Sequence, residues 1–564
     1  MYSNKENINI LTSLLVAHGI RKAVVCPGSR NAPIVHNLNE HPRIECYPVT
    51  DERSAGFYAL GMSLADDSPV AVCVTSGSAL LNLAPAVAEA SYRHHGLIVI
   101  SADRPSAWIE QLDGQTLPQP DALGCFVSKS VNLPEPKSDE ERWYCNRLIN
   151  EALIESKRHG CKSVHINVPI SEPLFNFTVE QLPVERKISF VNASINIEGL
   201  YRNIIHDLLE ASKPLIVIGQ ISRNDETTEK AIRAIKERFT IICEPLASGY
   251  ATPFTKALKL IDIAEAYYPD FILYLGDTLV SKHIKHFLRK ANDAECWAVS
   301  EDGCVHDTFM NLTGVIEANP TDVIRVVAEA IANDNSADDI DAAQLLTASS
   351  FAYRGMWNRL FSSAAAITDE FTPAYSQMAA VKEFEMSLED MDYDYDVHYA
   401  NSMSVRLADI YSWHYIWCNR GVNGIEGSLS TAAGFSVATE NMVFCVIGDL
   451  SFFYDQNALW NTNLSGNLRI LLLNNGCGGI FYSLPGLENS SACGKMVAAS
   501  HNTDAKGICN QNDIGYISAR NIDELHIGMA TFLTEKTKRP MVFEVFTNPD
   551  DDARVMAEYT KSRL

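Results

Sequence analysis

The sequence GDLSFFYDQNALWNTNLSGNLRILLLNNGCGGIF, residues 448–481, is the stretch from which the fold of this chain can be predicted. An apolar run at residues 442–447 leads into it, and a second apolar run at residues 468–473 lies inside it. Short apolar runs with turn residues at their ends are typical of buried parallel strands. The segment between the runs is compatible with a helix and includes Leu459, Trp460, Asn463 and Leu464. The stretch therefore predicts a strand–helix–strand unit.

Polar residues follow both predicted strands. Gly448 and Asp449 come directly after the first strand, and Asn474 and Asn475 come after the second. Ligands of open α/β sheets bind at the carboxyl ends of the strands. A hard cation prefers carboxylate, amide and carbonyl oxygens. The stretch therefore predicts a cation site at Asp449 and Asn475.

Length and composition limit the classes of protein to which the chain can belong. A chain of 564 residues exceeds what one hydrophobic core serves, so two to four domains are expected. The composition, 46% hydrophobic and 21% charged, is that of a globular protein. The net charge of −24 argues against nucleic acid and anionic membranes as partners. An anionic ligand would therefore need a locally basic site.

Targeting signals and paired cysteines are not recognisable in the sequence. The first residues lack the apolar region of a signal peptide, and no apolar run has the length of a membrane span. The fourteen cysteines are scattered and form no CxxC pair, which predicts neither a zinc site nor a disulfide framework. We expect a cytoplasmic protein, because free cysteines are typical of a reducing compartment.

The pattern of strand, turn and helix recurs along the whole chain and predicts an α/β fold. Further strands are expected at residues 22–26, 44–49, 70–74, 97–101, 163–168, 214–218, 239–243, 271–275, 416–418 and 541–546. Repeated units of this kind imply parallel, doubly wound sheets. We predict three Rossmann-like domains, at residues 1–182, 183–345 and 346–564. The middle domain lacks a GxGxxG fingerprint, so a bound dinucleotide is not expected there.

Three sequence elements together resemble the superfamily of thiamine diphosphate-dependent enzymes. The pair Gly448-Asp449 and Asn474-Asn475 resembles its diphosphate-binding motif, although Leu450 stands where a glycine is usual. In the first domain, Glu52 follows a predicted strand and precedes a helix of small residues, as the activating glutamate of the superfamily does. The Thr75-Ser-Gly sequence with Asn82 is similar to a further element of the same domain. The resemblance implies a pyrimidine-binding first domain and a diphosphate-binding third domain.

A narrower resemblance covers all three domains. The chain is similar to the 2-succinyl-5-enolpyruvyl-6-hydroxy-3-cyclohexene-1-carboxylate (SEPHCHC) synthases of menaquinone biosynthesis. The motifs that carry this resemblance are PGSR at residues 27–30, TDERSAG at 50–56, ADRP at 102–105, Gln115, NRG at 419–421 with Gly424-Ile425, and GDLS at 448–451. It implies a transferase that decarboxylates 2-oxoglutarate and adds the resulting succinyl carbanion equivalent to isochorismate in a 1,4 sense.

The resemblance assigns roles at the cofactor. Glu52 would contact the pyrimidine ring and favour the tautomer that activates thiamine diphosphate. Asp449, Asn475 and the Cys477 carbonyl would bind Mg²⁺ or Mn²⁺, and Ile425 would hold the cofactor in a bent conformation, unless it is an ordinary core residue. The other cofactor-binding residues implied are Pro27, Thr75, Ser76, Gly77, Asn82, Gly448, Leu450, Ser451, Gly478, Ile480 and Phe481.

The implied substrates carry several carboxylates, which the forked guanidinium group of arginine binds well. Gln115 is expected to act near the thiazolium ring. The substrate-binding residues implied are Ser29, Arg30, Arg104, Gln115, Lys282, Ser402, Arg406, Arg420, Phe481 and Leu484. His283 departs from the family pattern, because it follows Lys282 where an arginine is usual and is only partly charged at neutral pH.

The resemblance also implies an assembly. Pyrimidine and diphosphate domains of this superfamily meet across subunits, so we expect a homodimer or a dimer of dimers with the active site at the subunit interface. The loop at residues 484–502 is a candidate lid. Two alternatives remain open, namely another thiamine diphosphate-dependent lyase of the acetolactate synthase kind and a non-catalytic binding relative. The arginine set counts against the first, and Glu52, Asp449 and Asn475 count against the second.

Overall fold

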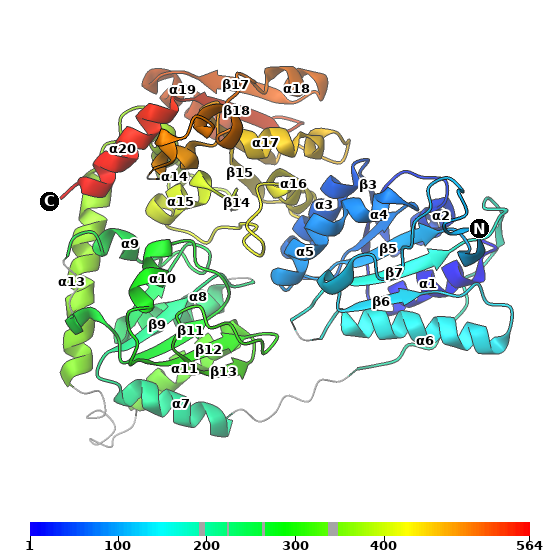
Figure 1. Cartoon of the computed structure of the whole chain (residues 1–564), viewed down its shortest axis with the longest axis horizontal. Helices are drawn as coiled ribbons and strands as arrows, with labels where there is room; N and C mark the ends of the chain where they lie inside the picture. The colour runs from blue at the N-terminus through cyan, green and yellow to red at the C-terminus, as the bar shows by residue number, and fades with distance from the viewer. Residues whose placement is uncertain are drawn as a thin grey trace.

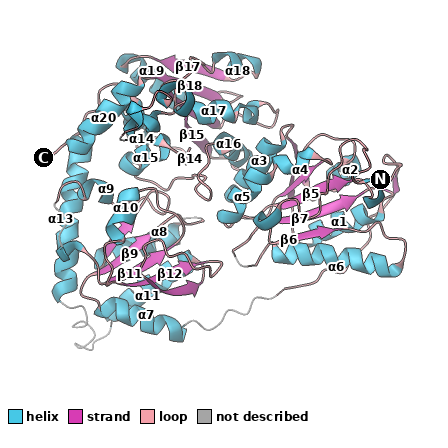
Figure 2. Cartoon of the chain, viewed as in Figure 1, coloured by secondary structure: helices cyan, strands magenta, loops and turns pink. Residues whose placement is uncertain are grey.

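The computed structural model describes residues 1–158, 160–190, 198–222, 225–261, 265–336, 348–484 and 486–563. These residues form three α/β units, each built on its own parallel sheet, as Figure 1 shows by chain order and Figure 2 by secondary structure. The predicted fold class is confirmed. The domain limits at residues 182 and 183 stay a prediction, and those at 345 and 346 lie at the edge of the segment 337–347, outside the described residues.

The first unit contains a six-stranded sheet in the order β3-β2-β4-β5-β7-β6. Its strands are β2 (Lys22–Val25), β3 (Glu45–Pro48), β4 (Ala71–Val74), β5 (Ile98–Asp103), β6 (Lys129–Asn132) and β7 (Val164–Pro169). Its helices are α1 (Glu6–Ala17), α2 (Ala32–Glu40), α3 (Glu52–Asp66), α4 (Ser78–Asn82), α5 (Ala84–Tyr92) and α6 (Asp139–Glu155). A short antiparallel pair, β1 (Tyr2–Ser3) and β8 (Phe177–Val179), ties its two ends together.

The second unit contains a five-stranded sheet in the order β10-β9-β11-β12-β13. Its strands are β9 (Pro214–Ile218), β10 (Thr240–Cys243), β11 (Phe271–Leu275), β12 (Glu295–Ser300) and β13 (Leu312–Glu317). Its helices are α7 (Glu198–Glu210), α8 (Glu226–Arg238), α9 (Phe254–Ala257), α10 (Lys282–Leu288) and α11 (Pro320–Ser336). The long helix α13 (Ala348–Glu370) runs along one side of the molecule from this unit to the third (Figure 1).

The third unit contains a five-stranded sheet in the order β14-β15-β16-β18-β17. Its strands are β14 (Tyr395–Tyr399), β15 (Met442–Gly448), β16 (Leu468–Asn474), β17 (Gly515–Ala519) and β18 (Met541–Phe546). Its helices are α14 (Gln377–Leu388), α15 (Met403–Tyr411), α16 (Ser428–Val437), α17 (Asp449–Tyr454), α18 (Lys506–Gln511), α19 (Ile522–Thr534) and α20 (Pro549–Lys561). Strands β15 and β16 pair in parallel, as the sequence predicts.

Two local expectations in the third unit are wrong. Residues 416–418 form no strand, and only a single bridge joins Trp417 to His398, because the chain leaves this position after one pairing. The helix between β15 and β16 is confined to α17 and a 3₁₀ turn at Gln456–Leu459, so Trp460, Asn463 and Leu464 lie outside it. The Asn461 side chain accepts a hydrogen bond from the Asn463 amide, which offers the backbone an alternative to the helix.

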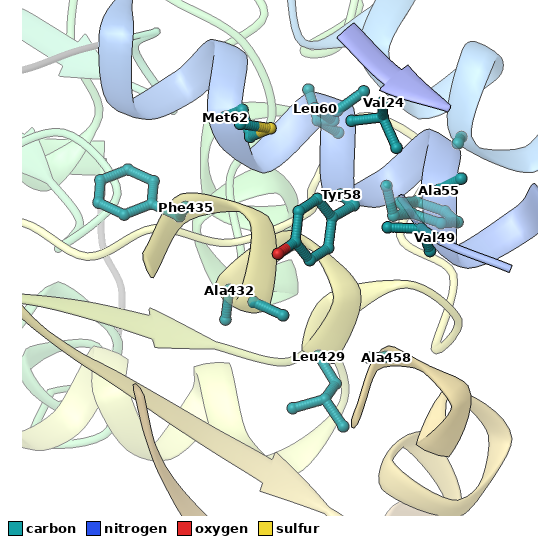
Figure 3. Close-up of a cluster of buried hydrophobic side chains, with 14 of the residues drawn as sticks. Val24, Val49, Ala55, Tyr58, Leu60, Met62, Leu429, Ala432, Phe435 and Ala458 are labelled. Carbon is teal, nitrogen blue, oxygen red and sulfur yellow. The ribbon is translucent and has the colours of Figure 1, made fainter. Parts of the chain in front are cut away.

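Close helix packing joins the first unit to the third. A Cβ atom added to Gly61 of α3 would lie 1.9 Å from the Thr431 carbonyl oxygen of α16, and one added to Gly434 would lie 2.0 Å from the Tyr58 carbonyl oxygen. A buried cluster of apolar side chains from both units surrounds this crossing, and Figure 3 shows Tyr58 between helices α3 and α16. The first and third units therefore share one hydrophobic core, which fixes the start of α3 relative to the third sheet.

Candidate active site

The predicted cation ligands meet at the carboxyl ends of β15 and β16. Asp449 is the first residue of α17, and Asn475 directly follows β16. The backbone amide of Cys477 donates hydrogen bonds to Asp449 Oδ2 at 3.1 Å and to Asn475 Oδ1 at 3.3 Å. One backbone N–H therefore brings a carboxylate, an amide oxygen and the peptide group of Cys477 into a single turn.

The chemistry of this turn fits a hard divalent cation. Asp449 is only 3% exposed, and burial raises the pKa of its carboxyl group to about 6, although the Leu450 amide and His501 act against this rise. A bound cation would compensate the buried negative charge, and the available ligands are the oxygens that Mg²⁺ prefers. Burial raises the pKa of the Cys477 thiol to about 12, so the thiol stays protonated and the carbonyl is the group of Cys477 that suits such an ion.

Two neighbours of this turn are not among the predicted site residues. The Asn475 Nδ2 group donates a hydrogen bond to Asp552 Oδ2 at 3.0 Å, which turns the amide oxygen toward Asp449. His501 Nε2 lies 3.4 Å from Asp449 Oδ2, and the His501 amide donates to the Gly476 carbonyl at 2.7 Å. Asp552 lies on α20, 77 residues after Asn475, and no local sequence signal connects the two. His501 lies in the candidate lid loop, and its contact with Asp449 was not predicted.

The other predicted cofactor-binding residues of the third unit lie around the same turn. The Ser451 hydroxyl donates a hydrogen bond to the Ile425 carbonyl oxygen. The Ile425 side chain is 40% exposed and is therefore not an ordinary core residue. Gly478, Ile480 and Phe481 follow the turn at the start of a 3₁₀ segment, Gly479–Ser483.

A second cluster lies at the carboxyl ends of the strands in the first sheet. Glu52 begins α3 and accepts a hydrogen bond from Asn82 Nδ2 at 3.2 Å. The loop at Pro27 approaches Thr75 so closely that a Cβ atom on Gly28 would lie 2.4 Å from the Thr75 Cβ. Gly77, at φ +83°, has the Gln115 backbone beside it, 3.3 Å from where a Cβ atom would stand. Glu52, Thr75, Gly77, Asn82 and Gln115 thus lie along one edge of the sheet, and their roles at a cofactor stay a prediction.

Within one chain, the two clusters lie on elements that touch. Asn457 Nδ2 donates to Asp51 Oδ2 at 2.7 Å, and Arg53 donates to the Tyr454 carbonyl at 2.7 Å. Asp51 and Arg53 are the sequence neighbours of Glu52. Tyr454 is the last residue of α17, and Asn457 comes shortly after it. A site shared between subunits therefore stays a prediction, because the first unit of a chain already contacts its own third unit.

The predicted arginines have protein partners. Arg30 donates to the Ile170 carbonyl at 2.9 Å and pairs with Glu172 at 3.2 Å. Arg104 pairs with Asp113 at 2.9 Å and donates to the Gly114 carbonyl at 3.1 Å, so it holds the loop that carries Gln115. Arg420 donates to Asn401 Oδ1 at 3.1 Å, and its Nε atom is buried with no hydrogen-bond partner among the described residues.

A cavity of about 440 Å³ opens between the second and third units, and we call it the main cavity. Its wall includes the predicted residues Lys282, Arg406, Asn475, Ile480 and Leu484. His283, which departs from the family pattern, lines it as well, together with Lys256 and Lys259, which were not predicted. Ser29, Arg30, Arg104 and Gln115 of the first unit are not part of this wall. The Arg406 side chain donates to the Ser402 carbonyl at 2.6 Å, which places Ser402 next to the wall.

Comparison with known proteins assigns the family. The family model for the thiamine pyrophosphate enzyme, N-terminal TPP binding domain, matches residues 8–123. The SEPHCHC synthase of Bacteroides thetaiotaomicron is 43% identical over 577 residues, covering 99% of both chains. The chain belongs to the SEPHCHC synthase family. The synthase of Phocaeicola vulgatus is also 43% identical, covering 99% of this chain and 98% of the relative, and that of Porphyromonas gingivalis is 33% identical over 99% and 97%.

Membership of the SEPHCHC synthase family confirms the predicted family and the predicted thiamine diphosphate-binding first domain. In this family member the sequence GDLS, with Leu450 in place of a glycine, forms the β15–α17 junction. Among the residues that the structure describes, no helix is long and apolar enough to cross a membrane.

Proposed function

We propose that this chain is a SEPHCHC synthase of menaquinone biosynthesis. In this proposal it decarboxylates 2-oxoglutarate and adds the succinyl fragment to isochorismate, using thiamine diphosphate with Mg²⁺ or Mn²⁺. The observation that carries the proposal is the oxygen-ligand turn of Asp449, Asn475 and Cys477, whose Asn475 lines the main cavity. The other charged groups in the wall are the basic Lys256, Lys259, Lys282, His283 and Arg406 and the acidic Asp409 and Asp552. Such a cavity suits multiply charged carboxylate substrates in a chain whose net charge is −24.

The roles that we propose for the chain's own groups are supported by the resemblance and by the contacts described above. Thiamine diphosphate, when bound, supplies the nucleophilic carbon and accepts the electron pair that decarboxylation releases. Glu52 would contact the pyrimidine ring of the cofactor, and Asn82 donates the hydrogen bond that orients the Glu52 side chain. Asp449, Asn475 and the Cys477 carbonyl would hold the divalent cation, which would neutralise the charge of the diphosphate. Lys282 and Arg406 bind substrate carboxylates in the main cavity, and Arg104 positions Gln115.

We also propose that the protein is a homodimer or a dimer of dimers in the cytoplasm. The oligomer is supported by the wall of the main cavity, to which Arg30, Arg104 and Gln115 of the same chain do not contribute. A first unit from a second chain would bring these residues to the cavity. The cytoplasmic location is supported by the fourteen cysteines, all of which are free.

The direct test of the reaction is an assay with purified protein, thiamine diphosphate, Mg²⁺, 2-oxoglutarate and isochorismate. The proposal predicts that isochorismate disappears only when all components are present. Consumption of pyruvate without loss of isochorismate would instead assign the chain to the acetolactate synthase kind of lyase.

A further inference from the structure

A second, smaller pocket of about 130 Å³ adjoins the main cavity, and we call it the outer pocket. Its lining residues are Leu258, Lys259, His283, His286, Phe287 and Lys290. Lys259 and His283 line both pockets, so the two spaces share a wall. The outer pocket therefore lies at the margin of the proposed substrate site.

The polar part of the outer pocket is entirely basic. Two lysines and two histidines line it, and no carboxylate does. In the described part of the chain, no hydrogen bond or ion pair engages the side chains of Lys259, His283, His286 or Lys290. The protein carries 70 acidic residues against 46 lysines and arginines, so a basic pocket without an acidic partner is unusual for this surface. Two ammonium groups and two imidazole rings that can donate hydrogen bonds suit an anionic ligand in one small space.

Basic side chains continue from the outer pocket inward, with the carboxylates of Glu244 and Asp409 among them. Burial lowers the pKa of His283, and the positive charges of Lys259 and His286 lower it further. Burial likewise lowers the pKa of Lys285; Arg420 and Lys282 act in the same direction, and the Glu244 carboxylate opposes them. Arg420 in turn adds to the effect of burial on the Arg406 guanidinium, whose pKa is lowered too. The ammonium groups of Lys290 and Lys259 in the outer pocket thus lie on the way to Lys282 and Arg406 in the wall of the main cavity.

The outer pocket is formed partly by buried side chains and by a helix whose first turn is fixed by hydrogen bonds. Leu258 and Phe287 are 8% and 2% exposed and form its apolar part. The Glu244 carboxylate fixes the start of α10 by accepting hydrogen bonds from the amides of Val280 and Ser281, the latter at 2.9 Å. Ligand cavities for whole organic molecules usually measure about 300–1,000 Å³, so the outer pocket has room for one end of a small ligand only.

We propose that the outer pocket is a second anion-binding subsite, which binds one carboxylate of a small dicarboxylate before the molecule enters the main cavity. The identity of that dicarboxylate as 2-oxoglutarate rests on the proposed function. The subsite itself rests on the shared wall, the unpaired basic side chains and the size of the pocket. Basic residues at the mouth of a site raise the local concentration and the association rate of anions, an effect that salt weakens.

The test uses the full-length protein and the double variant Lys259→Gln/Lys290→Gln. Its matched control is Lys536→Gln/Lys538→Gln, which removes the same charge from an exposed loop between α19 and β18. The probe is succinate, titrated calorimetrically without turnover. We expect the wild type and the control to bind succinate in two steps per chain, and the double variant to lose one step.

Kinetics give a second readout. We expect the double variant to lower kcat/KM for 2-oxoglutarate and to flatten its dependence on ionic strength, with no such change in the control. Equal titrations and equal salt dependence in all three proteins would overturn the subsite even if the synthase reaction is confirmed. A lost succinate step in a protein that does not consume isochorismate would support the subsite while rejecting the proposed function. Inorganic phosphate that binds the outer pocket more tightly than succinate would overturn the assignment to dicarboxylates.

Discussion

Asp449 and Asn475 accept hydrogen bonds from the same backbone N–H, that of Cys477, at 3.1 and 3.3 Å. This shared donor holds the oxygens of two side chains from different strand ends beside one another. The proposed cation site depends on that arrangement. The side chains that support the arrangement can be replaced to test it.

Asp552 orients the Asn475 amide group and is not itself a proposed cation ligand. Replacing Asp552 should therefore weaken cation binding indirectly. We predict that Asp552→Ala lowers the affinity for Mg²⁺ and thiamine diphosphate about 10- to 100-fold, the usual cost of losing such a supporting contact. The control is Asp550→Ala, an exposed neighbour on the same helix. Cofactor titration followed by protein fluorescence measures both. Equal affinities in the two variants would contradict the role of Asp552.

Glu52 and Asp449 allow the subunit arrangement to be tested. We predict that Glu52→Gln still binds thiamine diphosphate but loses turnover, and that Asp449→Asn loses cofactor binding. If one site combines Glu52 of one chain with Asp449 of another, mixing and reassembling the two inactive variants restores up to about a quarter of the wild-type activity. Inactive mixtures that contain verified hybrid dimers would place both residues of a site in one chain, in line with the contact of α3 with its own α16 and α17.

The crossing of α3 and α16 requires glycine at residue 61. A Cβ atom there would lie 1.9 Å from the Thr431 carbonyl oxygen, which belongs to the backbone and has little freedom to move. We predict that Gly61→Ala lowers the free energy of unfolding by about 1–3 kcal/mol, the range for overpacked cores. Gly507→Ala is the control, because no atom lies within 4 Å of its Cβ position. Because Gly507 lies in a helix, Gly507→Ala should leave the free energy of unfolding unchanged or raise it by up to about 1 kcal/mol. Urea denaturation of both variants and the wild type measures these changes in the free energy of unfolding. Equal changes in the two variants would contradict the requirement for glycine at residue 61.

A half-buried histidine, His94, links the first unit to the second and gives stability a pH dependence. His94 Nε2 lies 3.4 Å from Asp277 Oδ1, and His94 Nδ1 contacts the Gly160 carbonyl at 2.9 Å. Burial acts to lower the pKa of His94, but Asp277, Glu301 and the Gly160 carbonyl outweigh it and raise the pKa to about 9.

The folded-state pKa of His94 is thus above the unfolded value of 6.5, so its contribution to stability is complete below pH 6.5 and is lost as the pH rises through 9. We predict that the wild type loses more stability than His94→Gln between pH 6.5 and pH 9.5. Denaturation midpoints at these two pH values measure the difference. Parallel losses in the two proteins would show that the interface between the units does not depend on a charged His94.

Much of the fold and part of the site could be predicted from the sequence. Residues 442–447 and 468–473 were predictable as strands because buried parallel strands are continuously apolar. Residues 416–418 carry a similar apolar signal but form one bridge only, since pairing depends on neighbours that the local sequence does not contain. Asp552 and His501 reach the site from 77 and 26 residues beyond Asn475, and only the folded chain brings them there. The basic wall at Lys256 and Lys259 was missed for the same reason.

The central claim is that decarboxylation of 2-oxoglutarate is coupled to addition to isochorismate. The most direct measurement follows labelled carbon dioxide from 2-oxoglutarate and the loss of isochorismate in the same reaction, with thiamine diphosphate and Mg²⁺ present. We predict one molecule of carbon dioxide for each isochorismate consumed, and neither process after Mg²⁺ is removed by a chelator. Release of carbon dioxide with isochorismate left unchanged would contradict the proposed function.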